Sequence, residues 1–317
     1  MTLYDVFNGD ADGICALQQL RLARPAQSRR ITGVKRDIQL LRRVFPEPGD
    51  SVTVLDISLD SNRADLVRIL DAGAEVDYFD HHHAGDVPAH PFLRAHLDRS
   101  ADVCTSLLVD RHLEGAHRLW AVVGAFGDNL DDVAGAIAAP LLGEPEIERL
   151  RELGRLLNYN GYGRTPEDLH IAPDALFERL HPYRNPLDFA AADEVFRRLR
   201  DGHAADMAQA ANLEPEVATP RLRVYVLPNE PWSRRISGTM ANDLIRQRPD
   251  VSHALLVPNT ASCYLVTVRV SPNGPRRADE FCLEFKSGGG RATAAGINHL
   301  PRERLADFVR RFQESFS

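Results

Sequence analysis

The sequence has no long apolar run. None of its hydrophobic stretches approaches the ~18 consecutive apolar residues that a membrane-spanning helix needs. Its first residues are also unlike a secretory signal, because Asp5 and Asp10 stand where such a signal is basic and then apolar. We therefore expect a cytoplasmic protein with no membrane partner.

Cysteine is scarce as well. The chain has four cysteines, at positions Cys15, Cys104, Cys263 and Cys282, and no two of them form a CxxC pair. This number and spacing argue against a disulfide framework and against a structural zinc site made of thiolates.

In the first two thirds of the chain, basic residues are outnumbered by acidic ones. The 317 residues carry a net charge of -7, with 44% hydrophobic and 26% charged residues, as in a soluble globular protein of about two domains. From Pro220 to Ser317, 15 Lys and Arg face 9 Asp and Glu, a net of about +6, which leaves about -13 for the remainder. This asymmetry suits a cation-holding site that faces an anion-holding surface, and ordinary surface variation explains it equally well. The overall acidity disfavours stable binding to long DNA or RNA, because many phosphates must then be neutralised.

Short apolar runs and amphipathic segments alternate in the first part of the chain. The expected strands are Leu3–Phe7, Arg30–Val34, Val52–Ile57 and Glu75–Phe79, and the expected helices between them are Ile14–Leu22, Gln39–Val44 and Arg63–Ala72. Such alternation is typical of βαβ units in a doubly wound parallel sheet. Residues 103–126, 131–157 and 190–213 have helical patterns.

The pattern restarts after a stretch, residues 214–220, that has the composition of a linker. The expected strands of the second part are Leu222–Leu227, Ala254–Val257, Cys263–Val270 and Phe281–Phe285, and its expected helices are Thr239–Arg246 and Arg302–Phe316. We therefore predict an α/β protein with an N-terminal doubly wound domain over 1–189, a connecting helix and linker over 190–220, and a smaller α/β domain over 221–317.

Carboxylates and imidazoles follow several of the predicted strands of the first domain. They are Asp10, Asp12, Asp56, Asp80, His81 and His82, and Asp128 precedes a later helix. Because the carboxyl ends of parallel strands meet at one edge of the sheet, we expect these residues to converge, with Asp128 joining them if its helix folds back over the sheet. Each loop alone is more often a turn or a helix cap. The combination favours a metal site.

The residue types at these positions indicate which metals to expect. Oxygen ligands favour Mg²⁺ or Mn²⁺, and imidazole shifts the preference toward Mn²⁺. More than four ligands suggest two ions, which together can activate a water and neutralise a transferring phosphoryl group.

The motifs "DADG", "VLD", "DHH" and "GDN", in this order, resemble those of the DHH phosphoesterase superfamily. The later stretch "SGGGRATAAG", residues 287–296, resembles the glycine-rich signature of the associated DHHA1 domain. This resemblance spans nearly the whole chain. It implies a DHH domain and a DHHA1 domain with a cleft between them, and a phosphoesterase that uses two Mn²⁺ ions.

The resemblance also implies roles for individual residues. Asp10 would bind one ion and Asp12 the other, Asp56 would bridge them, and His81 and Asp128 would complete the second site. His82 would lie beside the scissile phosphate. Asp80 would orient a histidine ligand from behind, and His83 has no matching role.

Three positions depart from the family pattern. Pyrophosphatases and small-nucleotide phosphatases of the superfamily have a histidine where this chain has Val6, and the exonuclease branch has an aspartate where it has Asn8. Asn8 could still be a weaker, neutral ligand, and the first metal site is then expected to bind less tightly or to fill only with substrate. In the second domain, Arg291 replaces the usual histidine.

The glycine signature predicts a phosphate-binding element. Gly288, Gly289 and Gly290 can present backbone N–H groups to an anion, and Arg291 adds a permanent charge. Arg269 matches a strand arginine that faces the substrate in relatives. A tightly packed turn beside a surface arginine would have the same sequence.

The expected substrates are short oligonucleotides (nanoRNA), 3′-phosphoadenosine 5′-phosphate or cyclic dinucleotides, and a homodimer is left open. The alternatives are a pyro- or polyphosphatase, and a catalytically weak nucleotide-binding regulatory protein.

Overall fold

The computed structural model describes residues 1–260 and 262–317. They form two compact units, Met1–Asp201 and Gly202–Ser317, and the boundary between them falls within helix α9 (Glu194–Ala210).

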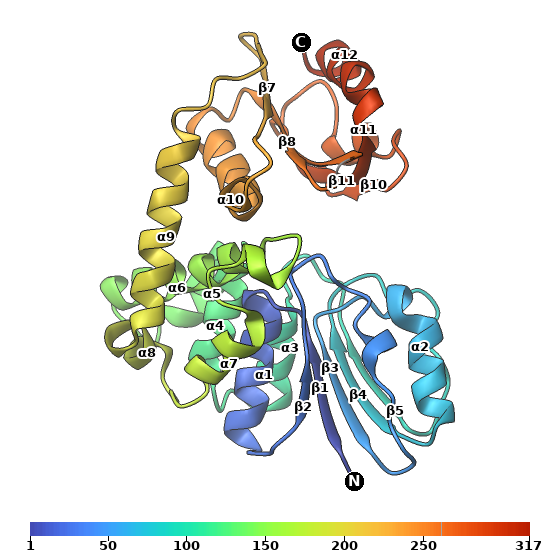
Figure 1. Cartoon of the computed structure of the whole chain (residues 1–317). Coiled ribbons are helices and arrows are strands. Elements are labelled where there is room, and N and C mark those ends of the chain that lie inside the picture. Colours follow the sequence, from blue (N-terminus) through green and yellow to red (C-terminus); the bar gives the residue numbers. More distant parts are fainter. Residues whose placement is uncertain (261) are drawn as a thin grey trace. The chain divides into compact units, whose positions relative to one another are not determined.

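The first unit is built on a five-stranded sheet with the order β2-β1-β3-β4-β5, in which every pair of neighbours is parallel (Figure 1). Its strands are β1 (Leu3–Phe7), β2 (Arg29–Ile31), β3 (Ser51–Leu55), β4 (Glu75–Asp80) and β5 (Leu93–Leu97). The order reverses between β1 and β3, because β2 lies on the other side of β1. In an open parallel sheet this reversal leaves a crevice at the carboxyl ends of the strands, where ligands bind.

Helices cover both faces of this sheet, as a doubly wound fold requires (Figure 1). They are α1 (Ala11–Ala23), α2 (Leu59–Asp71), α3 (Thr105–His112), α4 (Arg118–Gly127), α5 (Asp131–Ala138), α6 (Glu144–Gly161), α7 (Pro173–Leu180) and α8 (Pro186–Ala192), with 3-10 turns at Leu41–Arg43 and Pro166–Asp168. The two faces have separate hydrophobic cores, one with α1, α3, α4 and α6 and the other with α2.

The alternation of side chains along β1 shows how the sequence builds both cores. Tyr4 and Val6 point to the α2 side and Phe7 to the α1 side, and all three are buried. Val6, which stands where the phosphatases that the sequence resembles have a histidine, is therefore a core residue, fully buried among apolar neighbours.

Three details of the first unit differ from the sequence-based expectation. The segment Gln39–Val44 forms only the short turn Leu41–Arg43. The helical pattern over 103–126 is divided between α3 and α4, and that over 131–157 between α5 and α6. Strand β5 was not expected, because its sequence lacks an apolar run. It lies at the edge of the sheet, where it pairs with β4 alone, and its side chains are half-buried or exposed.

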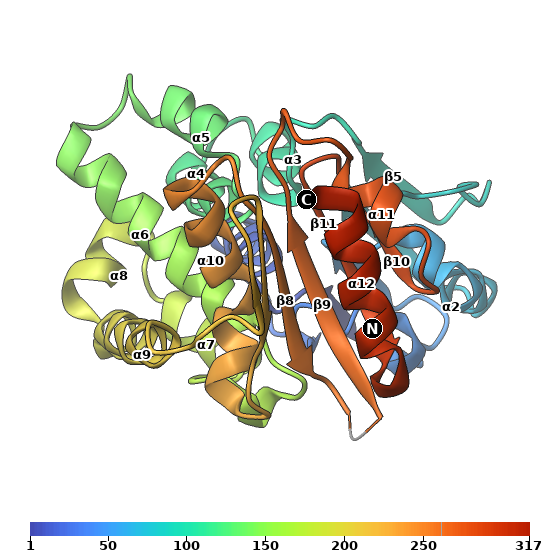
Figure 2. The ribbon, with the colours of Figure 1, turned by 90° about the horizontal axis from the view of Figure 1, so that it is seen from above.

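The second unit has a six-stranded mixed sheet with the order β10-β11-β9-β8-β7-β6, and Figure 2 shows β8 and β9 as its long central strands. Its elements are β6 (Val217–Ala218), β7 (Leu222–Val226), α10 (Pro231–Gln247), β8 (Ser252–Pro258), β9 (Cys263–Arg269), α11 (Ala278–Cys282), β10 (Gly288–Gly290), β11 (Ala294–Pro301), a 3-10 turn at Arg302–Arg304 and α12 (Leu305–Phe316). Only β7 and β8 pair in parallel among the described strands of this sheet.

The expected strand Phe281–Phe285 is wrong. The segment begins within α11 and continues as a turn. Because Phe281 and Phe285 are four residues apart, a helical turn directs both rings to the same side, where they contact Phe308 of α12. The same apolar spacing fits the period of a strand, which is why the sequence alone misleads here. Part of the expected linker, Val217–Ala218, is strand β6.

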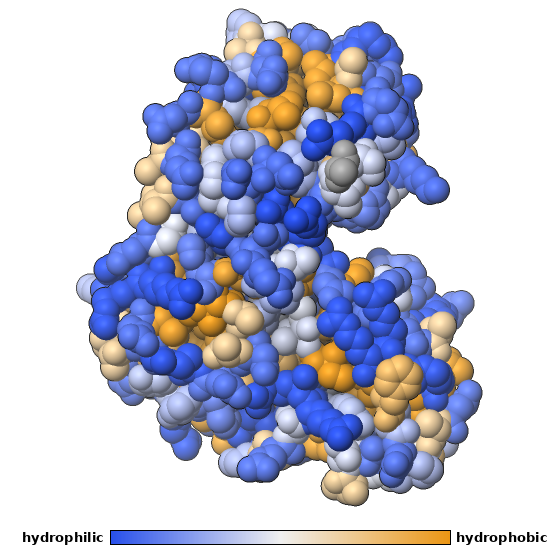
Figure 3. All heavy atoms as spheres, viewed as in Figure 1, coloured by the Kyte–Doolittle hydropathy of each residue, from blue (hydrophilic) through white to orange (hydrophobic). Residues whose placement is uncertain are grey.

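The surface in Figure 3 is mainly hydrophilic, with apolar side chains in patches on both units. Among the described residues, no helix is both long enough and apolar enough to span a bilayer.

A buried ion pair joins β1 to α1 and provides a test of the first unit. Asp5 is fully buried, and its two oxygens accept hydrogen bonds from Nε and Nη2 of Arg21 at 2.8 and 2.6 Å. Replacing Asp5 by Ala leaves a buried guanidinium without its partner, and we expect the free energy of unfolding to fall by about 3–5 kcal/mol in urea denaturation.

The matched control is Asp77→Ala on β4, which removes an Asp–Arg pair of similar geometry, with Arg94, that is exposed to solvent. We expect this change to cost less than about 1 kcal/mol. Equal effects of the two substitutions would contradict the role given to Asp5.

Candidate metal centre

Asp10 is the N-cap of helix α1. Its Oδ1 accepts the backbone N–H groups of Asp12 and Gly13, each at 3.1 Å. A side chain at Gly13 would clash with the backbone oxygen of Asn8, 2.3 Å from the position of its Cβ, so the tight turn requires glycine. The loop between β1 and α1 thus forms the helix cap that its sequence allows. This cap uses only one of the two carboxylate oxygens of Asp10.

Asp12 joins this loop to helix α3. Its two carboxylate oxygens accept the backbone N–H groups of Thr105 and Ser106, the first residues of α3, each at 2.7 Å. The carboxylate therefore occupies the positive end of a helix that is distant in sequence. This contact sets the place of α3 above the sheet edge.

Asp56 follows directly after strand β3 in a backbone conformation that is uncommon for a residue other than glycine, with φ of 61°. Its Oδ1 accepts the hydroxyl of Thr105 at 3.1 Å, and only 2% of the residue is exposed. The backbone N–H of Asp56 donates to the carbonyl of Phe79, which extends the sheet ladder beyond the strand and places Asp56 beside the end of β4. Such strained positions cluster at functional sites.

His81 faces three carboxylates. Its Nδ1 lies 3.0 Å from the carbonyl oxygen of Val103, which can only accept, so Nδ1 carries the proton of this bond. Its Nε2 is then directed at the carboxylates, 3.5 Å from Asp56 Oδ1, 3.8 Å from Asp128 Oδ2 and 4.0 Å from Asp12 Oδ2. These four side chains are called the His81 group below.

His82 points differently. Its Nδ1 lies 2.7 Å from Asp80 Oδ1 and 3.8 Å from Asp56 Oδ1, and 44% of its side chain is exposed, whereas Asp80 is fully buried. Asp80 therefore contacts His82. The partner that orients His81 is the Val103 carbonyl, not the expected carboxylate of Asp80. In the described part of the chain, Asp56, His81 and His82 offer ligand atoms that all lie within 4.8 Å of one another.

A lysine that was not predicted as a site residue, Lys35, lies at the same edge of the sheet. The Nζ of Lys35, four residues after β2, donates a short hydrogen bond to Asp10 Oδ2 and another to Asn158 Oδ1 at 2.9 Å, and lies 3.9 Å from Asp128 Oδ1. The position of Lys35 beyond the end of a strand in a parallel sheet was the available signal. Asn8 Nδ2 donates to the carbonyl of Lys35 at 3.2 Å.

Crowding of buried charges shifts the protonation of the site. Burial alone would lower the pKa of His81, but its hydrogen bond to Asp56 and the nearby carboxylates outweigh this effect and raise it to about 10. Burial and the charges of Asp10 and Asp12 raise the pKa of Asp56 well above its usual value. Burial also opposes ionisation of Asp10, but the adjacent Lys35 ammonium dominates and lowers the pKa of Asp10.

The His81 group fits a divalent cation. Oxygen and nitrogen ligands bound at about 2.0–2.2 Å to one ion lie about 3–4 Å from each other, which matches the distances around His81 Nε2. Two further buried oxygens, Asn8 Oδ1 and Asp80 Oδ2, have no hydrogen-bond partner among the described residues. Buried carboxylates in this number require compensating positive charge, and a bound cation supplies it.

The substrate-binding residues expected in the second unit lie on its sheet. Gly288, Gly289 and Gly290 form β10, an edge strand of the described sheet, which pairs with β11 in a hairpin. At the end of the hairpin Arg291 is exposed and its backbone bonds to Ala294, which in turn lies opposite Arg269 of β9. Arg291 thus lies in the turn between β10 and β11, and Arg269 lies on β9, the strand that pairs with β11. Arg269 Nε also donates to Asn242 of α10 at 2.9 Å.

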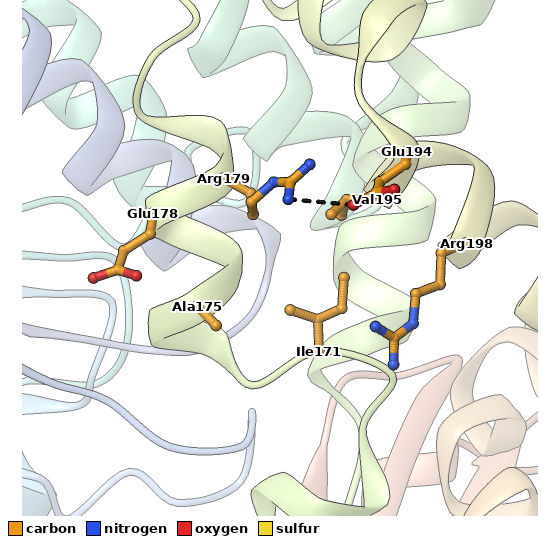
Figure 4. A pocket seen from close by; sticks show the side chains of 7 residues that line it. All are labelled: Ile171, Ala175, Glu178, Arg179, Glu194, Val195 and Arg198. Atoms are coloured by element: carbon orange, nitrogen blue, oxygen red, sulfur yellow. Dashed lines mark hydrogen bonds and ion pairs between the residues drawn. The ribbon is translucent and has the colours of Figure 1, made fainter.

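A pocket of 440 Å³ lies elsewhere in the first unit, between α7 and the start of α9 (Figure 4). It is lined by Ile171, Ala175, Glu178, Arg179, Glu194, Val195 and Arg198. Arg179 and Glu194 pair with each other at 3.3 Å, as the dashed line in Figure 4 shows. The lining includes none of the carboxylates of the sheet edge, and its charges are of both signs.

Comparisons with known proteins place the fold. No family model and no curated protein sequence matches the chain. Solved structures similar to it include an exonuclease RecJ bound to manganese, with 16% sequence identity and a TM-score of 0.60 over 99% of this chain and 89% of that one. RecJ of Thermus thermophilus in complex with Mn²⁺ has 19% identity and a TM-score of 0.65. The match covers 99% of this chain, which spans about half, 51%, of that longer protein.

A third similar structure is PggH of Vibrio cholerae, a pGpG-specific phosphodiesterase. It has 15% identity and a TM-score of 0.53 over 99% of this chain and 97% of that one. At these identities the likeness concerns the arrangement of the backbone.

The raised pKa of His81 predicts how metal affinity depends on pH. Because a cation binds the neutral imidazole, His81 must lose its proton, and we expect Mn²⁺ affinity to rise by up to about tenfold per pH unit between about pH 7 and 9. The stability of the metal-free chain depends on pH in the opposite direction. The charged imidazolium stabilises the fold below the unfolded pKa of about 6.5, and this contribution is lost as the pH rises through about 10.

Isothermal titration calorimetry in buffers of different ionisation enthalpy measures both the affinity and the protons released, about one or more per ion at about pH 7. Binding without proton release and without pH dependence would contradict the assignment of His81 as a ligand.

Proposed function

We propose that this chain, which has the fold of the DHH phosphoesterases, is a metal-dependent phosphoesterase that hydrolyses phosphodiester or phosphomonoester bonds of short oligonucleotides or small nucleotides. The observation that carries the proposal is the His81 group, in which one imidazole nitrogen faces the buried carboxylates of Asp12 and Asp56 and the partly buried one of Asp128 at the carboxyl edge of a parallel sheet. Carboxylates and imidazole at these distances suit a divalent ion, and the Mn²⁺ in the two RecJ structures supports manganese as that ion.

In this proposal the residues of the first unit hold the ion and the phosphate. Asp12, Asp56, His81 and Asp128 bind the cation. A divalent ion supplies charge compensation for the phosphoryl group and a nucleophile at neutral pH, by lowering the pKa of a bound water. His82, half-exposed and oriented by Asp80, is the side chain available to a phosphate oxygen or a leaving group.

The second unit would select the substrate. Arg269 on β9 and Arg291 in the turn between β10 and β11 carry permanent charge, and the partly exposed strand Gly288–Gly290 lies at the edge of the described sheet, which suits a phosphate-ended ligand. The specificity of PggH for a dinucleotide supports a short nucleotide as the substrate here. The net charge of -7 disfavours stable binding of long DNA.

The catalytic proposal is tested with a panel of short RNA, cyclic dinucleotides and 3′-phosphoadenosine 5′-phosphate in the presence of Mn²⁺. We expect turnover of at least one class. Because Asp56 lies at the centre of the cluster, Asp56→Ala should lower it by on the order of 10³-fold, and His82→Ala by about 10²–10⁴-fold.

The matched control is His83→Ala, an exposed histidine of the same loop, which should leave turnover unchanged. Full activity of Asp56→Ala would refute the site. Release of phosphate from polyphosphate alone would identify a polyphosphatase, and tight nucleotide binding without turnover would identify a regulatory protein.

The glycine strand gives a separate test of substrate binding. A Cβ at Gly289 meets no atom within 4 Å, whereas one at Gly288 would lie 1.8 Å from the backbone oxygen of Cys282. Gly289→Ala should therefore keep the stability of the unit and raise KM if substrate approaches this backbone. Gly288→Ala should instead lower the melting temperature. An unchanged KM in the stable Gly289→Ala variant would argue against substrate contact at β10.

A further inference from the structure

The first unit has a cation of its own built into the carboxylate cluster. The ammonium of Lys35 bonds to Asp10 Oδ2 and to Asn158 Oδ1. The backbone around it is fixed at two points, because the Lys35 N–H donates to the carbonyl of Gly161 at 2.8 Å and its carbonyl accepts Asn8 Nδ2. The side chain is 22% exposed, so the ammonium is largely enclosed.

Asp128 lies between this ammonium and His81. Its Oδ1 is 3.9 Å from Lys35 Nζ, and its Oδ2 is 3.8 Å from His81 Nε2. With one oxygen toward the ammonium and the other toward the atom at which His81 would bind an ion, Asp128 has the arrangement of a carboxylate between two cations. One of the two centres here is an ammonium.

The carboxylate that a second ion would use on this side of the site, that of Asp10, is already engaged. Asp10 gives Oδ1 to two backbone N–H groups and Oδ2 to Lys35. Asn8, which replaces an acidic residue of the exonuclease branch, donates its amide nitrogen to the Lys35 carbonyl, so that only its neutral Oδ1 is left without a hydrogen-bond partner among the described residues. The donor set on this side of the site therefore does not fit a second divalent ion while Lys35 is in place.

The choice of lysine is unusual for this chain. Of its 38 basic residues only two, Lys35 and Lys286, are lysines. An ammonium is a compact point charge with three donors, whereas a guanidinium is planar and broad. Among closely spaced oxygens the compact group can replace a metal ion in position, with a charge of one instead of two.

We propose that the Lys35 ammonium takes the place of the second divalent ion, so that the chain binds one divalent ion, in the His81 group, and Lys35 supplies the other positive charge next to the substrate phosphate. The inference rests on the proposed phosphoesterase function and specifies its site further. The positive charge of Lys35 is covalently attached, so a chelator removes only one of the two positive centres.

The number of bound ions tests this inference. Isothermal titration with Mn²⁺ and metal analysis after gel filtration should give one ion per chain for the wild type. Lys35→Met removes the ammonium and frees Asp10, and we expect two ions per chain. Their proximity should convert the electron paramagnetic resonance signal from that of isolated Mn²⁺ to that of a coupled pair.

Two further variants serve as controls. Lys35→Arg keeps the charge and should bind one ion, and Lys286→Met removes the other, exposed lysine and should also bind one. Circular dichroism checks that each variant is folded. If Lys35→Met does not fold, the wild type and Lys35→Arg still decide the question.

Two ions in the wild type, or in folded Lys35→Arg, would overturn the inference, and so would a single ion in folded Lys35→Met. The stoichiometry does not depend on turnover, so the two proposals fail separately. Two ions with hydrolysis would retain the function and reject the role of Lys35. One ion in the wild type and two in Lys35→Met, without hydrolysis of any substrate, would retain the role of Lys35 and reject the proposed function.

Discussion

The structure of the first unit has to accommodate several buried carboxylates at one edge of a parallel sheet. Asp10, Asp12, Asp56 and Asp80 are each at most 2% exposed, and water cannot screen their mutual repulsion. Each is therefore given a specific donor: backbone N–H groups for Asp10 and Asp12, a hydroxyl for Asp56 and an imidazole for Asp80. The repulsion that remains is what a bound cation relieves, so the same constraint links the stability of the unit to its chemistry.

These contacts also assemble the sheet edge. Asp12 holds the start of α3, Thr105 of that helix reaches Asp56, and the carbonyl of Val103 just before it fixes the ring of His81. Residues 103–106, at the start of α3, thus position three of the candidate ligands. Residues that hold the ion also hold the fold, and substitutions among them should be interpreted with a measurement of stability beside the measurement of activity.

Prediction from the sequence succeeded where periodicity and loop chemistry act locally. The alternation of apolar runs predicted four of the five strands of the parallel sheet, and the confirmed α/β fold follows from it. The edge strand β5 was missed because it has no apolar run, and Phe281–Phe285 was assigned to a strand because a short apolar segment fits both periods. At the site, the strand-end positions of Asp10, Asp12, Asp56 and His81 were readable from the sequence, and their roles as ligands stay a prediction.

The sequence by itself determined which residues would meet, because the carboxyl ends of parallel strands share one edge and the four motifs stand at those ends. Only the tertiary structure decided how they meet. The direction of a side chain depends on its contacts in the folded chain, many of them with distant segments. In this structure Asp80 contacts His82, His81 bonds to the carbonyl of Val103, and the ammonium of Lys35 bonds to Asp10. The departure at Asn8 was visible in the sequence, and so was the position of Lys35 beyond the end of β2, but nothing in the sequence shows that the Lys35 ammonium turns toward Asp10.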